Sequence, residues 1–201
     1  MAIVINGSGT VTGLAVGGLP DGTVDDGTVA SGIASSKLTG ALPAISGASL
    51  TGFTDAQMPA GSVLQVVSAT FGTSTSSTTT SWVNTPITAS ITPTSTSSKI
   101  LISVNTPVWV ASAGTYAGRT SIFRGTSTGT NLGHSALGFA NIWNADSTGS
   151  GDNAGMSYLD SPSTTSSQAY TVCMRSEGNS SLITVMDSGT KATITLQEIA
   201  G

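Results

Sequence analysis

From residue 62 onward, apolar and polar residues alternate along the chain with a period of two, which is the pattern of half-buried β-strands. In the stretch SKILISVN, Ile100, Ile102 and Val104 fall on one face, and Ser103 and Asn105 fall on the other. No segment shows a convincing helical period. The alternation predicts strands near residues 62–71, 81–91, 98–110, 119–125, 133–143, 154–160, 168–176, 181–187 and 191–199.

Short strands that follow one another with turn residues between them are typical of an all-β fold. We therefore predict that residues 61–201 form an antiparallel β-sandwich of the jelly-roll-like kind, which we call the head. A segment of this length buries roughly two-thirds of its unfolded surface, so it can form a core of its own. The composition agrees, because charged residues make up only 8% of the chain, against about 25% in a typical soluble domain.

Residues 1–60 have a different organisation. Glycines divide them into short phrases such as GTVTGL and DDGTVASGI, and the stretch KLTGALPAISGASLTGF uses the phrase LTG twice. Each phrase carries only one or two apolar side chains, so it cannot bury them against itself. Repeats of this kind become stable by packing on neighbours or on copies in other chains. We expect residues 1–60 to form an extended, Gly-rich attachment and shaft region that trimerises.

Charge and targeting patterns exclude several classes of partner. The net charge of −4 lacks the basic footprint of a nucleic-acid-binding protein. No window approaches the 18 or so apolar residues of a membrane-spanning helix, and the first residues lack the basic start of a secretory signal. We expect no nucleic-acid partner, no membrane insertion and a chain that is made in the cytoplasm.

The residues that catalysis would require are sparse. His134, the one histidine, is predicted in mid-strand beside Ser135, and no nucleophile-elbow motif surrounds that serine. Asp160 and Glu177 are the candidate acids for a two-carboxylate glycosidase, but both are predicted at or beyond strand ends. Cys173 is the only cysteine, and we interpret it as a buried small apolar residue. We expect no enzyme and no cofactor, with a sugar depolymerase as the catalytic alternative.

Two sets of polar residues, one loop segment and the three arginines, have more than one interpretation. The segment DSTGSGDN places oxygen ligands at alternate positions from Asp146 to Asp152, as in a calcium loop, but it lacks the closing bidentate glutamate. A polar surface loop is the favoured interpretation, and no metal site is predicted. The three arginines, Arg119, Arg124 and Arg175, are interpreted as solvated strand ends. They could instead pair with carboxylates between subunits or bind an anionic glycan.

Recognition sites on sandwiches usually lie in the connecting loops. The loops predicted to be longest and most polar are 72–81, 125–133 and 144–153. The last of these is the best candidate, because its carboxylates and amides can hydrogen bond sugar hydroxyls and the adjacent tryptophan can stack on a sugar face. The predicted receptor-binding residues are Trp143, Asn144, Asp146, Asp152 and Asn153. The alternative, that Trp143 is a core residue, is held equally open.

Three stretches carry a family resemblance. INGSGTVTGLAVGGLPDGTVDDGTVASG resembles the N-terminal segments of bacteriophage tail-fibre proteins, particularly those of marine and cyanobacterial phages, and KLTGALPAISGASLTGF resembles their shaft-like linkers. The stretch that begins GSVLQVVSATF, together with SYLDSPSTTSSQAYTVCMRS and the terminal ITLQEIAG, resembles a C-terminal domain of phage fibre and virion proteins. The resemblance covers almost the whole chain.

This resemblance implies a virion structural protein that is a homotrimeric tail fibre, assembled in the host cytoplasm. Its N-terminal region would attach to another virion protein, a tail adaptor or nozzle protein or a capsid protein, and its head would contact a host surface glycan. The residues expected to carry that attachment are Ile3, Val4, Ile5, Leu14, Val16 and Leu19. The chain is short for a tail fibre, so a capsid fibre or a decoration or cement protein is the alternative, and a soluble lectin-like module is another.

Overall fold

The computed structural model describes residues 4–5, 11–12, 57–111, 116–144, 148–178 and 181–201. The chain divides into two units, Met1–Thr51 and Gly52–Gly201, whereas the sequence-based boundary lies between residues 60 and 61. In the first unit, β1 (Val4–Ile5) pairs antiparallel with β2 (Val11–Thr12). Two of the expected attachment residues therefore lie in β1, and Ile3, Leu14, Val16 and Leu19 lie outside the described residues.

The second unit contains the head. Its described strands are β3 (Val63–Phe71), β4 (Thr75–Ser77), β5 (Val83–Ile91), β6 (Lys99–Ala111), β7 (Tyr116–Arg124), β8 (Thr130–Asn131), β9 (Ala140–Asn144), β10 (Ser150–Asp160), β11 (Gln168–Ser176), β12 (Leu182–Val185) and β13 (Ala192–Ile199). A single turn of 3-10 helix, η4 (Asp187–Gly189), joins β12 to β13.

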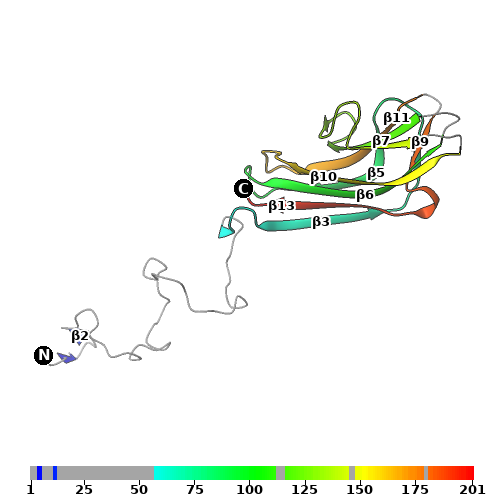
Figure 1. Ribbon diagram of the computed structural model, residues 1–201. Coiled ribbons are helices and arrows are strands. Elements are labelled where there is room, and N and C mark those ends of the chain that lie inside the picture. The colour runs from blue at the N-terminus through cyan, green and yellow to red at the C-terminus, as the bar shows by residue number, and fades with distance from the viewer. Residues whose placement is uncertain (1–3, 6–10, 13–56, 112–115, 145–147, 179–180) are drawn as a thin grey trace. The chain divides into compact units, whose positions relative to one another are not determined.

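The strands form two antiparallel sheets (Figure 1). The first has the order β3-β13-β6-β12-β4, and β10 pairs with the full length of the free side of β6. The second has the order β5-β11-β7-β8, with β9 also pairing with β7. Because the apolar faces of both sheets contribute to one buried cluster, the head is an antiparallel β-sandwich. The fold class predicted from the sequence is confirmed.

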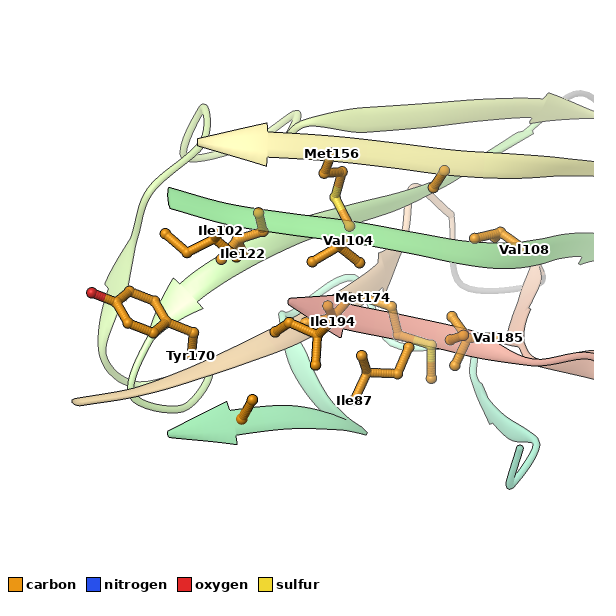
Figure 2. Packing of buried hydrophobic residues seen from close by; sticks show 14 of the residues in the cluster. Ile87, Ile102, Val104, Val108, Ile122, Met156, Tyr170, Met174, Val185 and Ile194 are labelled. Atoms are coloured by element: carbon orange, nitrogen blue, oxygen red, sulfur yellow. The ribbon is translucent and has the colours of Figure 1, made fainter. Parts of the chain in front are cut away.

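Most of the buried cluster was predictable from the alternation. Ile100, Ile102 and Val104 of β6 point into the sandwich and are at most 5% exposed. Figure 2 shows several of these side chains between the layers, with the ring of Tyr170 at one end of the cluster. Both faces of strand β11 are buried, and Cys173 is fully buried, as its interpretation as a buried small apolar residue predicts. Two flanking strands, β5 and β7, pair with β11 and leave it in the middle of its sheet.

The predicted strand at 133–143 is wrong over its first half. Only a single bridge joins His134 to Gly138, and the strand begins at Ala140. Gly138 has a φ of +68°, and an added Cβ there would lie 2.4 Å from the carbonyl oxygen of Thr120, so the chain turns sharply at this residue. His134 therefore lies in a turn and not in mid-strand.

The imidazole of His134 has a structural role in this turn. Its Nδ1 atom accepts hydrogen bonds from the backbone N–H groups of Ala136 and Leu137, at 3.2 and 3.0 Å. The indole N–H of Trp82 donates to the carbonyl oxygen of Ser135 at 2.9 Å and holds the turn against β5.

Two further short strands, β4 and β8, lie inside the predicted loops 72–81 and 125–133.

Candidate functional site

Trp109 lies on the outward face of the first sheet. Its neighbours on β6, Val108 and Val110, point into the core and are 2% and 0% exposed, while Trp109 is 38% exposed. This orientation follows from the period of two, because successive side chains on a strand point to opposite faces. The register places Gly151 of β10 on one side of Trp109 and Thr184 of β12 on the other.

Two glycines at the start of the neighbouring strand β10, Gly149 just before it and Gly151 within it, make room for the indole ring of Trp109. A Cβ atom added to Gly149 would lie 2.6 Å from the ring atom Cζ2 of Trp109, and one added to Gly151 would lie 2.8 Å from Cε3. Gly149 also has a φ of +98°, a conformation that favours glycine. The ring therefore packs directly on the backbone at the start of β10, and part of its surface stays open to solvent.

Trp109 forms part of a cavity of about 400 Å³. One wall comes from the start of β10, the floor from β6, and the other wall from η4 and the residue after it. The lining residues are Pro107, Val108, Trp109, Gly151, Asp152, Asn153, Asp187, Ser188 and Thr190.

Backbone hydrogen bonds and one buried side chain hold the wall formed by η4 in place. Met186 and Ser188 both have positive φ values, 55° and 54°, which turn the chain out of the sheet after β12. The N–H of Met186 donates to the carbonyl oxygen of Pro107 at 3.0 Å, and the fully buried side chain of Met186 anchors the turn in the core. The N–H and the hydroxyl of Thr190 both donate to the carbonyl oxygen of Asp187. The cavity therefore has a wall that is fixed relative to β6.

The polar groups of the cavity are acidic or neutral. Asp152 and Asp187 supply carboxylates, Asn153 an amide, and Ser188 and Thr190 hydroxyl groups, and no Arg or Lys is among the lining residues. One carboxylate oxygen of Asp152 accepts the N–H of Asn153 at 2.7 Å. Because a carboxylate has about four lone-pair positions, Asp152 and Asp187 both keep capacity to accept hydrogen bonds from a ligand.

The structure divides the predicted receptor-binding residues. Asp152 and Asn153 line the cavity, but they belong to β10, so the predicted loop 144–153 is wrong from Ser150 onward. Trp143 lies on β9 and is 54% exposed, so the alternative that it is a core residue is wrong. Asn144 ends β9, and Asp146 lies outside the described residues.

Sequence reasoning missed Trp109 and Asp187 as members of this site. A tryptophan between two valines, V-W-V, on a strand with alternating burial was a usable signal for an aromatic residue on the outer face. Asp187 had no comparable signal, because its place beside Pro107 depends on how η4 leaves the sheet.

Asp160 and Glu177 do not form a pair of acids. Asp160 lies beside Tyr170 near the start of β11, whereas Glu177 follows the end of that strand. Seven residues of extended chain separate Tyr170 from Glu177, which corresponds to roughly 23 Å. The two carboxyl groups of a glycosidase lie about 5 to 10 Å apart, so these two residues cannot act together.

Each of these acids is instead paired with an arginine of the same chain. Arg119 donates to Glu177 at 2.6 Å, and Arg124 donates to Asp160 at 2.5 and 2.8 Å. Arg175 lies over the ring of Trp82, with its guanidinium carbon 5.7 Å from the ring centre. The interpretation of Arg119 and Arg124 as solvated strand ends is therefore wrong.

No group of three or more His, Cys, Asp or Glu among the described residues could hold a metal ion. Asp146, the first residue of the possible calcium loop, lies outside them. No described helix is long and apolar enough to cross a membrane.

Comparison with known proteins finds distant structural similarity to proteins of virus particles. The chain is similar to a protein in the structure of infectious bursal disease virus Gx strain, with 12% identity over 68% of this chain and a TM-score of 0.36. It is also similar to the VP2 subviral particle of that virus, with 12% identity over 68% of this chain and a TM-score of 0.31. The chain spans less than two-fifths of the length of these proteins, 37% and 38%. No family model matches the chain, and no curated protein matches it.

Proposed function

We propose that this protein is a virion structural protein, a trimeric fibre that attaches to the particle by its N-terminal region and contacts a host surface glycan with its head. The observation that carries the contact is the Trp109 cavity. It combines a mostly apolar lining, which includes an aromatic ring partly open to solvent, with a few carboxylate, amide and hydroxyl groups on its two walls. An aromatic surface with a few placed polar groups is the usual composition of a small-ligand site.

The assignment to a virion is supported by the sequence of both regions. Residues 1–60 consist of glycine-separated phrases without the apolar residues for a core of their own, and they resemble phage fibre segments. Identical chains wound around one axis would cover each other's apolar side chains. The low charge of the chain, 8%, reduces repulsion between identical groups in such a trimer.

Competition for host cells tests the contact. An excess of the purified full-length chain should block adsorption of the particles that carry it, and the same chain with Trp109 replaced by alanine should block less effectively. If the purified chain neither binds the cells nor reduces adsorption, the proposed host contact is wrong.

Location and assembly are tested separately. A cryo-EM map of the particle would place the chain on the tail, where we propose it lies, or on the capsid, as expected for a capsid fibre or a decoration protein. Light scattering of the purified chain should give three times the mass of one chain. A stable monomer at micromolar concentration would contradict the trimer, and a head that folds and binds glycan without any association with particles would favour a soluble lectin-like module.

A further inference from the structure

We infer that the Trp109 cavity selects an uncharged pyranose unit and rejects sugars that carry a carboxylate or a sulfate group. This inference rests on the proposed function and specifies the ligand class of the same site. Three observations carry it: the open surface of the indole, the size of the cavity, and the distribution of charge around it.

The indole provides a platform for a sugar ring. Trp109 is fixed by β6 on its backbone side and by the backbone at Gly149 and Gly151 on its ring side, so little side-chain entropy remains to be lost on binding. Since 38% of the residue stays exposed, the ring can stack on the C–H groups of a pyranose face. The cavity of about 400 Å³ lies near the lower end of the range for small-molecule sites, about 300 to 1,000 Å³.

The exposed lining of the cavity is mostly apolar, and the few polar groups of its walls suit sugar hydroxyls. The carboxylates of Asp152 and Asp187 only accept hydrogen bonds, and sugar hydroxyls donate them. The amide of Asn153 donates and accepts, whereas the hydroxyls of Ser188 and Thr190 already donate to Asp187, at 3.3 and 2.8 Å, and offer only acceptor positions. An uncharged sugar can therefore donate hydrogen bonds from its hydroxyl groups to acceptors on both walls.

An anionic sugar would meet like charge without a compensating cation. Asp152 and Asp187 are on the cavity, and no Arg or Lys lines it. The ammonium end of Lys191, the basic residue nearest to η4 in the sequence, packs against Gly72. Arg119 and Arg124 are already paired with Glu177 and Asp160. The described arginines and lysines therefore leave the cavity acidic.

The experiment uses the purified full-length chain on a glycan array with uncharged and anionic members, followed by calorimetric titration of the strongest hits. We expect binding to uncharged glycans and at least about tenfold weaker binding to sialylated or sulfated versions of the same glycans. Trp109→Ala should weaken binding of the uncharged hits by at least about tenfold, because the stacking surface is lost.

A matched control comes from the second exposed tryptophan. Trp143, which is 54% exposed and is not part of the cavity lining, should tolerate replacement by alanine with less than about a twofold change in affinity. Trp109→Phe keeps an aromatic platform and should retain measurable binding even if Trp109→Ala disturbs the fold. Circular dichroism and the unfolding midpoint show whether each variant is folded.

A variant that lacks the two negative charges tests the discrimination against anionic glycans separately from the stacking on Trp109. The double replacement Asp152→Asn and Asp187→Asn keeps an acceptor oxygen at both positions and removes both negative charges. It should reduce the discrimination against anionic glycans to within about threefold.

Several results would overturn the inference. These are a preference for anionic glycans, binding that is lost with Trp143→Ala but kept with Trp109→Ala, unchanged discrimination in the double Asn variant, and binding to no uncharged member of the array. In each case the purified chain can still block particle adsorption, which would leave the proposed host contact in place. A chain that binds uncharged glycans but does not compete for cells would contradict the proposed function alone.

Discussion

Arg124, the last residue of β7, forms a bidentate ion pair with Asp160, the last residue of β10. The guanidinium donates from Nε to Oδ2 at 2.8 Å and from Nη2 to Oδ1 at 2.5 Å. The two strands belong to different sheets, so the pair joins the layers of the sandwich at one end. The side chain of Asp160 is 4% exposed and that of Arg124 is 29% exposed, so the carboxylate has little access to water.

Tyr170 completes this group. Its hydroxyl donates to Oδ2 of Asp160 at 2.7 Å, and burial together with this hydrogen bond raises the pKa of the phenol well above its ordinary value. The hydrogen bond to Asp160 likewise raises the pKa of Arg124, against the opposing effect of partial burial. Both donors therefore keep their protons across the physiological pH range, Tyr170 as a neutral phenol and Arg124 as a cation.

We predict that Arg124→Met destabilises the head by about 3 kcal/mol, because it leaves Asp160 buried without its cation. Arg124→Lys keeps the charge but loses the two-point geometry, so it should cost less, about 1 to 2 kcal/mol. Urea unfolding followed by tryptophan fluorescence measures both. Lys99→Met removes an exposed cation at the start of β6 and serves as the control. Equal effects of Arg124→Met and Lys99→Met would show that the ion pair contributes nothing.

Glu198 is fully buried on β13 and makes stability depend on pH. Burial alone would raise its pKa, but hydrogen bonds from Gln65 at 2.5 Å and from the N–H and hydroxyl of Thr94 at 2.7 and 2.8 Å outweigh that effect, and the pKa is lowered. The folded protein therefore binds the proton of Glu198 less readily than the unfolded chain does. The resulting stability is present above the ordinary pKa of 4.5 and is lost as the pH falls through the lower folded value.

We predict that Glu198→Gln lowers stability at pH 7 and flattens the dependence of the melting temperature on pH between about 5 and 3. Thermal unfolding at a series of pH values checks both effects. Asp187→Asn, an exposed acid, is the control and should leave the slope unchanged. A slope in Glu198→Gln as steep as that of the unmodified chain would assign the acid sensitivity to other groups.

Gly118 of β7 leaves no space for a side chain. A Cβ atom there would lie 2.5 Å from Cγ2 of Val110 and 2.9 Å from Cδ1 of Ile183, both of which are fully buried. We predict that Gly118→Ala destabilises the head by about 1 to 3 kcal/mol through overpacking. Gly155→Ala is the matched control on β10, since nothing lies within 4 Å of its added Cβ. Denaturant unfolding should give a near-zero effect for Gly155→Ala, and a similar result at Gly118 would mean that the core accommodates the methyl group.

Cys173 should be chemically inert in the folded protein. It is fully buried, and burial raises the pKa of its thiol to about 12. The thiolate is the reactive form, so a thiol reagent at pH 8 should modify Cys173 only after the chain is unfolded in urea. Rapid modification of the native protein would show that the centre of the second sheet opens readily.

The sequence by itself determined most of the strands and many of the residues that enter the core. Ile100, Ile102 and Val104 alternate with Ser103 and Asn105, and the structure buries the first three. This could be predicted because the period of two is a local property of extended backbone and needs no knowledge of the partner strand. The second half of the predicted strand 133–143 was correct for the same reason, and the first half failed because backbone hydrogen bonds between His134 and Gly138 close a turn there.

The candidate site was decided only by the tertiary structure. Asp152 and Asn153 were visible as polar loop residues, but their partner Trp109 lies 43 positions earlier than Asp152 in the sequence, and it meets β10 only because Gly151 is in register with it. The same holds for Arg124 and Asp160, which were interpreted separately and become a pair when the ends of β7 and β10 meet across the sandwich. Strand register and the packing of two sheets are long-range relationships, so alternation along one strand carries no information about which residue lies opposite.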